Sequence, residues 1–547
     1  MASTKPSKTT SSKTSEATAA SVKDAMQFAP KTSTIAATTT SAKATVKATA
    51  KAATKATPKT VAPTKPALKE VLAIASEIYP LIKTGGLADV VGALPLALQT
   101  CAVHVTTLVP GYPRVMAALH AEPQAKVILS VKGFFGGSAQ LWSAHIAGMD
   151  LWVLDAPHLF NREGNPYLNT EGQDWGDNPV RFAALSLMGA QLAWGEYPEL
   201  NYQPDAMHVH DWQTALAPVY LHYLGQGRHR PKTIITIHNL AFQGQFPAGV
   251  FQYLGLPAQA FSNNGVEYYG CVGFLKAGIL FSDEITTVSP SYAHEITTPN
   301  AGMGMDGLLR AQHGRLSGIV NGIDTDVWNP ATDASLAQTF DVSDLSKRAV
   351  NKRAVEAHFG IAHSDAPLVC IVSRLTWQKG MDLLVNAIDA IVAKNVRVVI
   401  LGSGDTGLEA TLYAKQRQHP THVAIHTGYD ESLSHLMQGG CDAILVPSRF
   451  EPCGLTQLYG LRYGCVPVVT SVGGLNDTVI DANFAAVNAG VATGIACHEI
   501  SVDGIIHAVE RMVQLYAQPK IWQAMQTAGM TTDVGWANSA QLYQQLY

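Results

Sequence analysis

From residue 69 onward, short runs of β-branched and apolar residues alternate with longer segments whose apolar residues recur at helical spacing. This alternation predicts an α/β protein in which helices cross parallel β-sheets. In the first half, strands are predicted at residues 71–75, 103–109, 151–155, 206–210, 233–238 and 285–289. In the second half, they are predicted at residues 367–373, 396–402, 423–426, 443–447 and 466–470. Each half is therefore predicted to form a Rossmann-like, doubly wound domain.

The boundary between the two halves is predicted at Asn321-Gly322. A strand-like run over residues 316–320 ends there in Asn-Gly, which is a turn signal. A chain of 547 residues is too long for one hydrophobic core. We therefore predict an N-terminal domain at residues 69–322 and a C-terminal domain at residues 323–547, with a hinge between them. The last helix is a candidate for crossing back to the first domain.

Residues 1–68 differ in composition from the rest of the chain. Thr, Ala, Ser and Lys dominate this segment, which has eleven Lys, no Arg and two acidic residues, and so a formal charge of +9 against −4 for the whole chain. Few aromatic or branched apolar residues are present to form a core, so a disordered tail is predicted. A solvated tether is the favoured interpretation. Electrostatic contact with nucleic acid or an acidic surface, and a plastid transit peptide, are the alternatives.

Composition limits the class of protein and its location. No window holds about 18 consecutive apolar residues, and the start lacks the apolar core of a secretory signal, so neither a membrane span nor secretion is expected. The seven cysteines are scattered and form no CxxC pair, which indicates reduced thiols. A bacterial cytoplasm is the predicted location, and the plastid stroma is the alternative.

A short cassette with paired glycines occurs once in each predicted domain, as KTGGLADV at residues 83–90 and as SVGGLNDTV at residues 471–479. Glycine N–H groups at a helix start can bind an anion, because no Cβ blocks the approach and the helix adds about half a positive charge. Two similar lobes sharing a central cleft are therefore predicted. The glycines predicted to bind a phosphate or polar ligand are Gly85, Gly86, Gly473 and Gly474. The alternative is that each Gly-Gly only makes a tight turn.

Two cations follow the predicted strand at residues 367–373. Arg374 and Lys379 come directly before a predicted helix, and a rigid guanidinium beside a mobile ammonium suits the binding of a pyrophosphate. The next strand is followed by Gly402 to Gly407, which matches GxGxxG. A dinucleotide site is rejected there, since that fingerprint needs an acidic residue about twenty positions later and residues 421–429 contain none.

Histidines end another predicted strand. His208 and His210 point to the same face of a β run, so a metal site that recruits His238 is conceivable. No third ligand stands at a recognisable spacing, and no metal is expected. The favoured interpretation is that one histidine donates a hydrogen bond to a hydroxyl-rich substrate while the other packs.

Three further residues follow predicted strands of the second domain. Glu451 precedes Pro and Gly and is predicted to stabilise positive charge in the cleft, with a helix cap as the alternative. Cys453 is interpreted as a small loop residue, because no base stands beside it to make it a nucleophile. Tyr429 is placed either to stack on a nucleobase or to pack in the core.

Together these segments closely resemble bacterial glycogen synthase and plant starch synthase, the family that extends an α-1,4-glucan from a nucleotide sugar. The resemblance runs from about residue 71 to the C-terminus. The matching segments are residues 83–90, 208–212, 238–240, 274–278, 288–290, 321–324, 373–380, 447–459 and 473–475. It implies a GT-B glycosyltransferase, with two Rossmann-like domains facing a central cleft, that retains anomeric configuration without a cofactor or a metal.

The resemblance also implies roles for single residues. The residues that it implies to be catalytic are Glu451, Lys379, Arg374 and His210. The residues that it implies to bind the nucleotide-sugar donor are Lys83, Gly85, Gly86, Asp89, Asn321, Tyr429, Cys453, Gly454, Leu455, Thr456, Gly473 and Gly474. Lys83, Arg374 and Lys379 are expected on the donor phosphates, and Tyr429 on adenine. A broader group of relatives has a second glutamate where this chain has Tyr459, so a mechanism with two glutamates is not expected.

The predicted reaction is transfer of glucose from ADP-glucose to the non-reducing end of an α-1,4-glucan such as glycogen. Fixed donors are expected to stabilise the departing diphosphate, because charge develops there as the glycosidic bond breaks. The choice of ADP over UDP follows from the bacterial resemblance alone. Neither a membrane nor nucleic acid is an expected partner. The rival hypotheses are a non-catalytic glucan-binding protein and, from the GxGxxG string, an oxidoreductase.

Overall fold

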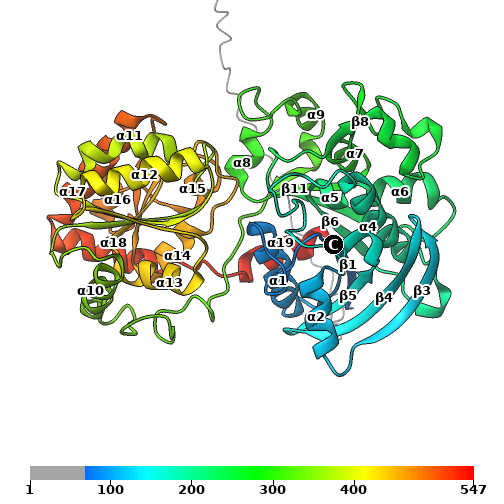
Figure 1. Ribbon diagram of the computed structural model, residues 1–547, viewed down its shortest axis with the longest axis horizontal. Coiled ribbons are helices and arrows are strands. Elements are labelled where there is room, and N and C mark those ends of the chain that lie inside the picture. Colours follow the sequence, from blue (N-terminus) through cyan, green and yellow to red (C-terminus); the bar gives the residue numbers. More distant parts are fainter. Residues whose placement is uncertain (1–67) are drawn as a thin grey trace, which may run out of the picture. The chain divides into compact units, whose positions relative to one another are not determined.

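The computed structural model describes residues 68–547, which contain two large β-sheets, each flanked by helices (Figure 1). All but the last residue of the predicted tail at 1–68 lies outside the described residues. The eleven strands predicted from the hydrophobic pattern are all present as parallel strands, so the prediction of two doubly wound α/β domains is confirmed.

The first sheet has nine strands in the order β12-β11-β7-β6-β1-β2-β5-β4-β3. Its strands are β1 (Lys69–Ile74), β2 (Val103–Pro110), β3 (Lys126–Phe134), β4 (Gly137–Ile146), β5 (Met149–Asp155), β6 (Ala206–His210), β7 (Lys232–Ile237), β11 (Glu284–Thr287) and β12 (Leu316–Gly318). The pairings are parallel except that β4 pairs antiparallel with both β3 and β5. The hydrophobic pattern did not predict β3 and β4. Many of their residues are exposed at the sheet edge, so the apolar signal there is weak.

Helices cover this sheet and form two hydrophobic clusters with it. They are α1 (Gly86–Gln99), α2 (Pro113–Ala121), α3 (Pro157–Phe160), α4 (Asn178–Ala193), α5 (Asp211–Thr214), α6 (Leu216–Leu224), α7 (Phe274–Phe281), α8 (Pro290–Glu295) and α9 (Asp306–Ala311). A small antiparallel sheet of β8 (Gln245–Pro247), β10 (Cys271–Gly273) and β9 (Glu267–Tyr268) also belongs to this half. The sequence pattern did not predict it, because strands of two or three residues are too short to show a period.

The second sheet is parallel throughout, in the order β15-β14-β13-β16-β17-β18. Its strands are β13 (Leu368–Val372), β14 (Arg397–Gly402), β15 (Val423–Thr427), β16 (Ala443–Val446), β17 (Val466–Thr470) and β18 (Ile495–Cys497). The chain order reverses between β13 and β16, and in doubly wound sheets such a reversal opens a crevice at the carboxyl ends of the strands. Ligands are therefore expected beyond the ends of β13 and β16.

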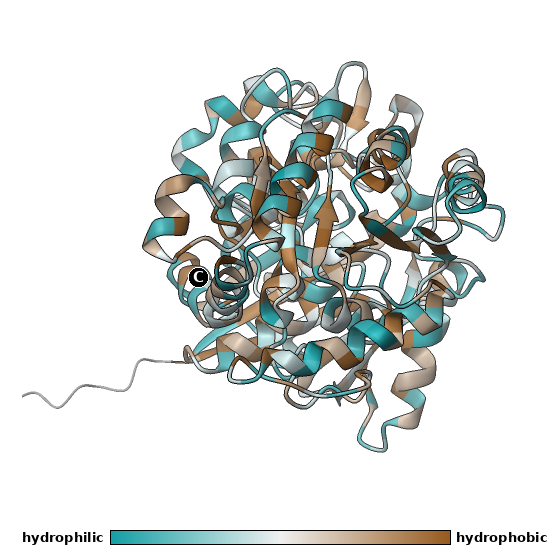
Figure 2. Ribbon diagram, turned by 90° about the vertical axis from the view of Figure 1, so that its left-hand side faces the viewer, coloured by the Kyte–Doolittle hydropathy of each residue, from teal (hydrophilic) through white to brown (hydrophobic). Residues whose placement is uncertain are grey.

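Amphipathic helices cover this second sheet as well. They are α10 (Arg348–Phe359), α11 (Met381–Val392), α12 (Thr406–Gln418), α13 (Glu431–Gly440), α14 (Thr456–Tyr463), α15 (Gly473–Thr478), α16 (Phe484–Ala489), α17 (Val502–Tyr516) and α18 (Pro519–Thr531). Figure 2 shows the apolar colouring concentrated on the central strands, with mixed colouring on the helices around them. This distribution fits strands buried on both faces of a parallel sheet.

The chain passes between the two halves at two places that lie side by side. The Ile323 N–H donates to the Val534 carbonyl oxygen at 2.9 Å, and a Cβ on Gly322 would lie 2.6 Å from the Gly535 backbone. After the second passage, helix α19 (Ala537–Leu546) packs against α1 (Figure 1). Its Tyr543 lies in one hydrophobic cluster with residues of β1, α1 and β2.

No helix among residues 68–547 has the length and apolar character needed to cross a membrane.

Candidate active site

The predicted site residues lie at or beyond the carboxyl ends of strands in both halves. Lys83 follows β1 and His210 ends β6, and these two strands are neighbours at the point where the first sheet reverses its order. Lys379 follows β13 and Glu451 follows β16, which are neighbours at the reversal of the second sheet. The sheet order thus brings residues far apart in the sequence to matching positions in the two halves.

Lys379 and Glu451 form an ion pair between the two loops of the second half. The Lys379 Nζ atom lies 2.5 Å from Glu451 Oε2, and the side chains are 18% and 7% exposed. Ser448 Oγ donates to the same carboxylate oxygen at 2.9 Å. The carboxylate therefore does not cap α14, which was the structural alternative for Glu451. Arg374 is exposed at the start of the β13 loop, where its guanidinium donates to Gln378 Oε1 at 3.4 Å.

The first glycine cassette presents its backbone at the surface. Helix α1 begins at Gly86, and Gly85 is its N-cap with extended backbone. Both glycines are exposed, and a Cβ built on Gly85 would meet no atom within 4 Å. Lys83 Nζ lies 2.7 Å from Asp89 Oδ1, so the cation is held beside the start of the helix. This geometry suits the binding of an anion at the N-terminus of a 14-residue helix.

Glu77 anchors this loop and was not predicted from the sequence. Its carboxylate accepts hydrogen bonds from the Thr84 N–H, from Thr84 Oγ1 at 2.7 Å, and from the Tyr167 hydroxyl. The side chain is buried, so these contacts fix the backbone directly before Gly85. Its only sequence signal is its position just after the first strand.

The second glycine cassette has a different geometry. The Gly473 N–H donates to Glu295 Oε1 at 2.7 Å, and the Gly474 N–H donates to the Glu451 and Pro452 carbonyl oxygens at 3.0 and 3.2 Å. A Cβ on Gly473 would lie 2.1 Å from the Glu451 carbonyl oxygen. Both amides are thus engaged within the protein, and the glycines allow two backbone segments to approach closely. This is the turn-and-packing geometry that the sequence left open, and contact of these two glycines with a donor stays a prediction.

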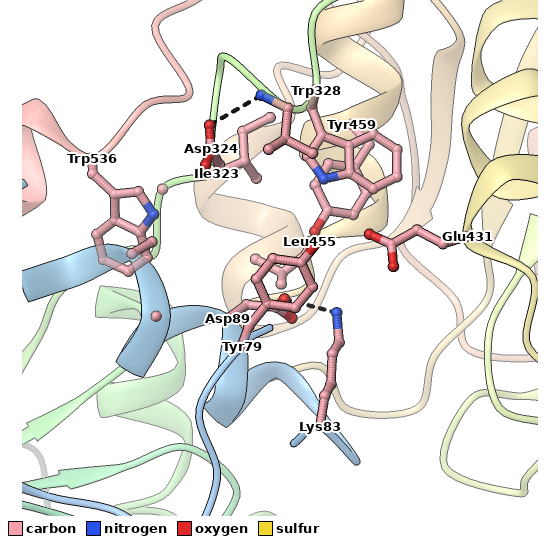
Figure 3. A pocket seen from close by; sticks show the side chains of 14 residues that line it. Tyr79, Lys83, Asp89, Ile323, Asp324, Trp328, Glu431, Leu455, Tyr459 and Trp536 are labelled. Atoms are coloured by element: carbon pink, nitrogen blue, oxygen red, sulfur yellow. Dashed lines mark hydrogen bonds and ion pairs between the residues drawn. The ribbon is translucent and has the colours of Figure 1, made fainter. Parts of the chain in front are cut away.

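A pocket opens between residues of the two halves (Figure 3). Figure 3 shows the Lys83–Asp89 pair on one side and Glu431 facing Tyr79 across the space. Burial raises the pKa of the Asp89 carboxyl, and the neighbouring Lys83 partly offsets that rise. Burial and the Glu431 charge also raise the pKa of Tyr79. The lining therefore combines one cation with several acceptors for hydroxyl or amino groups.

The wall of this pocket contains an aromatic stack that the sequence did not predict. The Trp328 ring lies 3.6 Å from the Tyr459 ring and 3.7 Å from the His435 ring, centroid to centroid, with near-parallel planes. Asp333 Oδ2 accepts from His435 Nδ1 at 2.7 Å and from the Tyr463 hydroxyl at 2.5 Å. Tyr459, the position of the second glutamate in broader relatives, is therefore a packing residue in this chain.

Three histidines form a buried cluster at the ends of β6 and β7. His208 Nδ1 lies 2.8 Å from the Tyr547 hydroxyl, and His208 Nε2 lies 2.6 Å from Thr236 Oγ1. His210 Nδ1 lies 3.0 Å from His238 Nε2. Both ring nitrogens of His208 are engaged by hydroxyl groups, so this donor set does not fit the metal site considered from the sequence. Among residues 68–547, no group of three or more ligand side chains is arranged for a metal ion.

Burial keeps this cluster uncharged. It lowers the pKa of His210 to about 3 and the pKa values of His208 and His238 well below their usual range. A neutral His210 can donate or accept a hydrogen bond at neutral pH but is not a proton donor of ordinary acidity. This agrees with the predicted contact between His210 and a sugar hydroxyl.

These histidines should make the fold sensitive to acid. In the unfolded chain they titrate near pH 6.5, so below that value the unfolded state binds more protons than the folded one. The contribution of the neutral histidines to the free energy of unfolding is therefore complete above about pH 6.5. It falls as the pH drops, by up to about 1.4 kcal/mol per pH unit for each histidine. Urea unfolding between pH 7.5 and pH 5 measures this slope. His210→Gln should reduce it, and an unchanged slope in that variant would contradict the assignment.

Five other residues were predicted to bind the nucleotide-sugar donor, and four of them directly follow Glu451 and Pro452 in the chain. Asn321 is buried, and its Oδ1 atom has no hydrogen-bond partner among residues 68–547, so an acceptor is available there. Burial raises the pKa of the Cys453 thiol to about 12, which keeps it protonated and excludes a thiolate nucleophile at neutral pH. Gly454 has a φ of +75°, Leu455 lines the pocket, and Thr456 begins α14.

Tyr429 lies at the surface beyond β15. Its side chain is 75% exposed, and its hydroxyl donates to Glu431 Oε2 at 2.7 Å. This exposure rules out the alternative that Tyr429 packs in the core. Its ring is available for stacking near the pocket that Glu431 lines.

Comparison with known proteins gives the family. The starch synthase catalytic domain family matches residues 70–311, and the glycosyl transferases group 1 family matches residues 356–525. A glycogen synthase of Mesorhizobium japonicum is 54% identical over 478 residues, which are 87% of this chain and 98% of the relative. A glycogen synthase of Rhodopseudomonas palustris is 53% identical over the same shares of the two chains. The chain belongs to the glycogen synthase family.

Solved structures agree with this assignment. The catalytic domain of Starch Synthase IV from Arabidopsis thaliana, bound to ADP and acarbose, has a TM-score of 0.79 at 30% identity and covers 88% of this chain and 99% of its own. A sucrose-phosphate synthase from Thermosynechococcus elongatus, with a TM-score of 0.52 at 15% identity, shares the fold. The chain is thus a GT-B glycosyltransferase of the glycogen synthase family.

Membership in this family excludes the oxidoreductase interpretation of the GxGxxG string, and the structure supplies another reason for its glycines. A Cβ on Gly402 would lie 1.9 Å from the Ser373 carbonyl oxygen, and a Cβ on Gly404 would lie 2.4 Å from that of Leu375. The first two glycines therefore let the β14 loop pack against the loop that carries Arg374 and Lys379.

Proposed function

We propose that this glycogen synthase family member transfers glucose from ADP-glucose to the non-reducing end of an α-1,4-glucan. The observation that carries the proposal is the Lys379–Glu451 ion pair at the crevice of the second sheet. This pair supports the assignment of Lys379 to the departing phosphate and of the neighbouring Glu451 carboxylate to the positive charge of the sugar. The names of the relatives and the ADP in the Arabidopsis structure support the choice of donor.

Each half contributes to binding the donor. Lys83 and the exposed N–H groups of Gly85 and Gly86 approach the donor phosphates from the first half. Arg374 and Lys379 approach them from the second half, and Tyr429 offers its exposed ring to adenine. His210 and the Oδ1 atom of Asn321, which has no hydrogen-bond partner in the described part of the chain, bind hydroxyl groups of the transferred glucose. Donors fixed in this way stabilise the diphosphate more as its charge grows, so they lower the barrier selectively.

The bond changes occur on one face of the sugar. The bond between the anomeric carbon and the phosphate oxygen breaks, and its electron pair stays on the phosphate. The acceptor 4-hydroxyl forms the new bond on the same face, so the departing phosphate oxygen is the base nearest to its proton. Cys453 remains protonated and takes no part as a nucleophile. Glu451 stabilises the positive charge that builds up on the ring.

A donor competition tests this proposal. The protein is incubated with glycogen and with radiolabelled ADP-glucose or UDP-glucose, and label in the polymer is measured. Preferred incorporation from ADP-glucose is expected. ADP-glucose at about 100 times its dissociation constant should also stabilise the fold by about 2.7 kcal/mol, while NADH should not. Binding of glucan without any transfer would instead identify the non-catalytic rival.

We place the protein in a bacterial cytoplasm, since the relatives named above are bacterial and all seven cysteines are free thiols.

A further inference from the structure

We propose that Arg449 and Asp382 form a clamp that holds the Lys379 loop against the Glu451 loop and so positions the Lys379–Glu451 pair for catalysis. Neither residue belongs to the site predicted from the sequence, and neither lines the pocket. The clamp acts through Lys379, so both members are positioning residues. The inference rests on the proposed function, because it assigns Lys379 to the departing phosphate.

Arg449 contacts the opposite loop through its backbone and its side chain. Its N–H donates to the Gln378 carbonyl oxygen at 2.9 Å, and its Nη1 donates to the Trp377 carbonyl oxygen at 2.8 Å. The guanidinium also lies over the Trp377 ring, 4.4 Å from its centroid. These contacts engage the two residues that come directly before Lys379.

Asp382 fixes the other side of the guanidinium. It accepts from Nη1 at 2.6 Å and from Nη2 at 2.7 Å, so the pair is bidentate. Arg449 lowers the pKa of Asp382, which therefore stays ionised at neutral pH. Asp382 lies in the first turn of α11, where the helix dipole also favours a carboxylate. A planar guanidinium with two parallel hydrogen bonds and a stacked ring has one orientation, which an ammonium group could not reproduce.

Two further contacts join the Lys379 loop to the Glu451 loop. Gly380 has a φ of +68°, and a Cβ there would lie 2.0 Å from the Pro447 carbonyl oxygen, so the loops touch through their backbones. Gln378 Nε2 lies 3.4 Å from the Phe450 carbonyl oxygen. Lys379 lies between Gln378 and Gly380, and Glu451 comes directly after Phe450, so the Lys379–Glu451 pair joins the same two loops. The spacing between its ammonium and carboxylate groups therefore depends on the alignment of the two loops.

Arg449→Lys tests the clamp, because lysine keeps the charge and loses the bidentate and stacked geometry. Displacement of a catalytic group by about 1 Å can cost about 100-fold in rate. We expect kcat to fall ten- to hundred-fold, with the KM for glucan within twofold of wild type and the melting temperature nearly unchanged. Arg230→Lys is the matched control, since Arg230 forms a bidentate pair with Asp283 in the first half at 2.8 and 3.0 Å. Its kcat should match wild type.

A double substitution separates positioning from general structural damage. If Arg449 acts through Lys379, Arg449→Lys should cost little further rate when Lys379→Ala is already present, because groups that act as a unit are not additive. Additive losses would overturn the proposal. So would a wild-type kcat in Arg449→Lys.

Asp382→Asn provides a milder test in case Arg449→Lys does not fold. A smaller fall in kcat is expected at unchanged stability, and no change in kcat would overturn the clamp. Failure of the proposed function would look different, because the wild-type protein itself would then transfer no glucose from ADP-glucose.

Discussion

Replacing Lys379 by alanine is expected to lower kcat by roughly 10²–10³-fold, as the loss of one oxyanion donor does in other enzymes. The substitution removes the cation assigned to the departing phosphate. It also leaves the Glu451 carboxylate, 7% exposed, with Ser448 as its remaining hydrogen-bond partner within residues 68–547. Initial rates at saturating glucan and ADP-glucose measure the effect. The KM for glucan should change little, because Lys379 is assigned to the donor side.

Lys394→Ala is the matched control for this prediction. Lys394 forms an ion pair of the same length, 2.5 Å, with Glu510 of α17 in the same half of the protein. Both partners are more exposed than Lys379 and Glu451, and pairs of this kind contribute about 1 kcal/mol or less to stability. Its kcat should equal that of wild type. Turnover of Lys379→Ala within threefold of the control would remove Lys379 from the proposed mechanism.

Gly474→Ala is expected to destabilise the second half by about 3 kcal/mol, in the range that overpacking of a tight interior causes. A Cβ at this position would lie 2.2 Å from the Cys453 carbonyl oxygen, and the backbone on both sides would have to move. The Glu451 loop would move with it, because the Gly474 N–H donates to the Glu451 carbonyl oxygen. Activity should therefore fall together with thermal stability, which calorimetry and rate measurements test in parallel.

Gly85→Ala, in the corresponding cassette of the first half, should behave differently. A Cβ there would meet no neighbour, and the extended backbone accepts alanine, so a cost under about 1 kcal/mol is expected. The methyl group would instead project where the donor phosphates are proposed to bind, so the KM for ADP-glucose should rise several-fold. Equal stability losses in the two variants would show that the cassettes share one structural role.

The two glycine cassettes share a sequence pattern and differ in the folded protein. Both contain Gly-Gly-Leu between a strand and a helix, and both were predicted to bind an anion. The Gly473 amide is occupied by Glu295, which is 178 positions away in the chain and belongs to the other half of the protein. No local pattern records such a partner. Local spacing therefore predicted the turn and could not predict which N–H groups the folded protein leaves exposed.

The positioning residues are a second example. Glu77 precedes the first glycine cassette, and Arg449 lies within the matching segment 447–459, where both resemble ordinary polar residues of a loop. Their role depends on partners such as Thr84, Tyr167 and Asp382, and on the close approach of the segments that carry them. The distances and burial that reveal this role exist only in the folded protein.

The amino-acid order alone predicts the two doubly wound domains and the resemblance to glycogen synthase. It also predicts that Lys83, His210, Lys379 and Glu451 lie where strands end. These follow from local periodicity and from motifs of adjacent residues, which are properties of short segments. The folded arrangement was needed to show that Lys379 pairs with Glu451, that the three histidines are buried and uncharged, and that the two glycine cassettes differ. These are properties of contacts between distant segments, and they depend on the order in which the strands join each sheet.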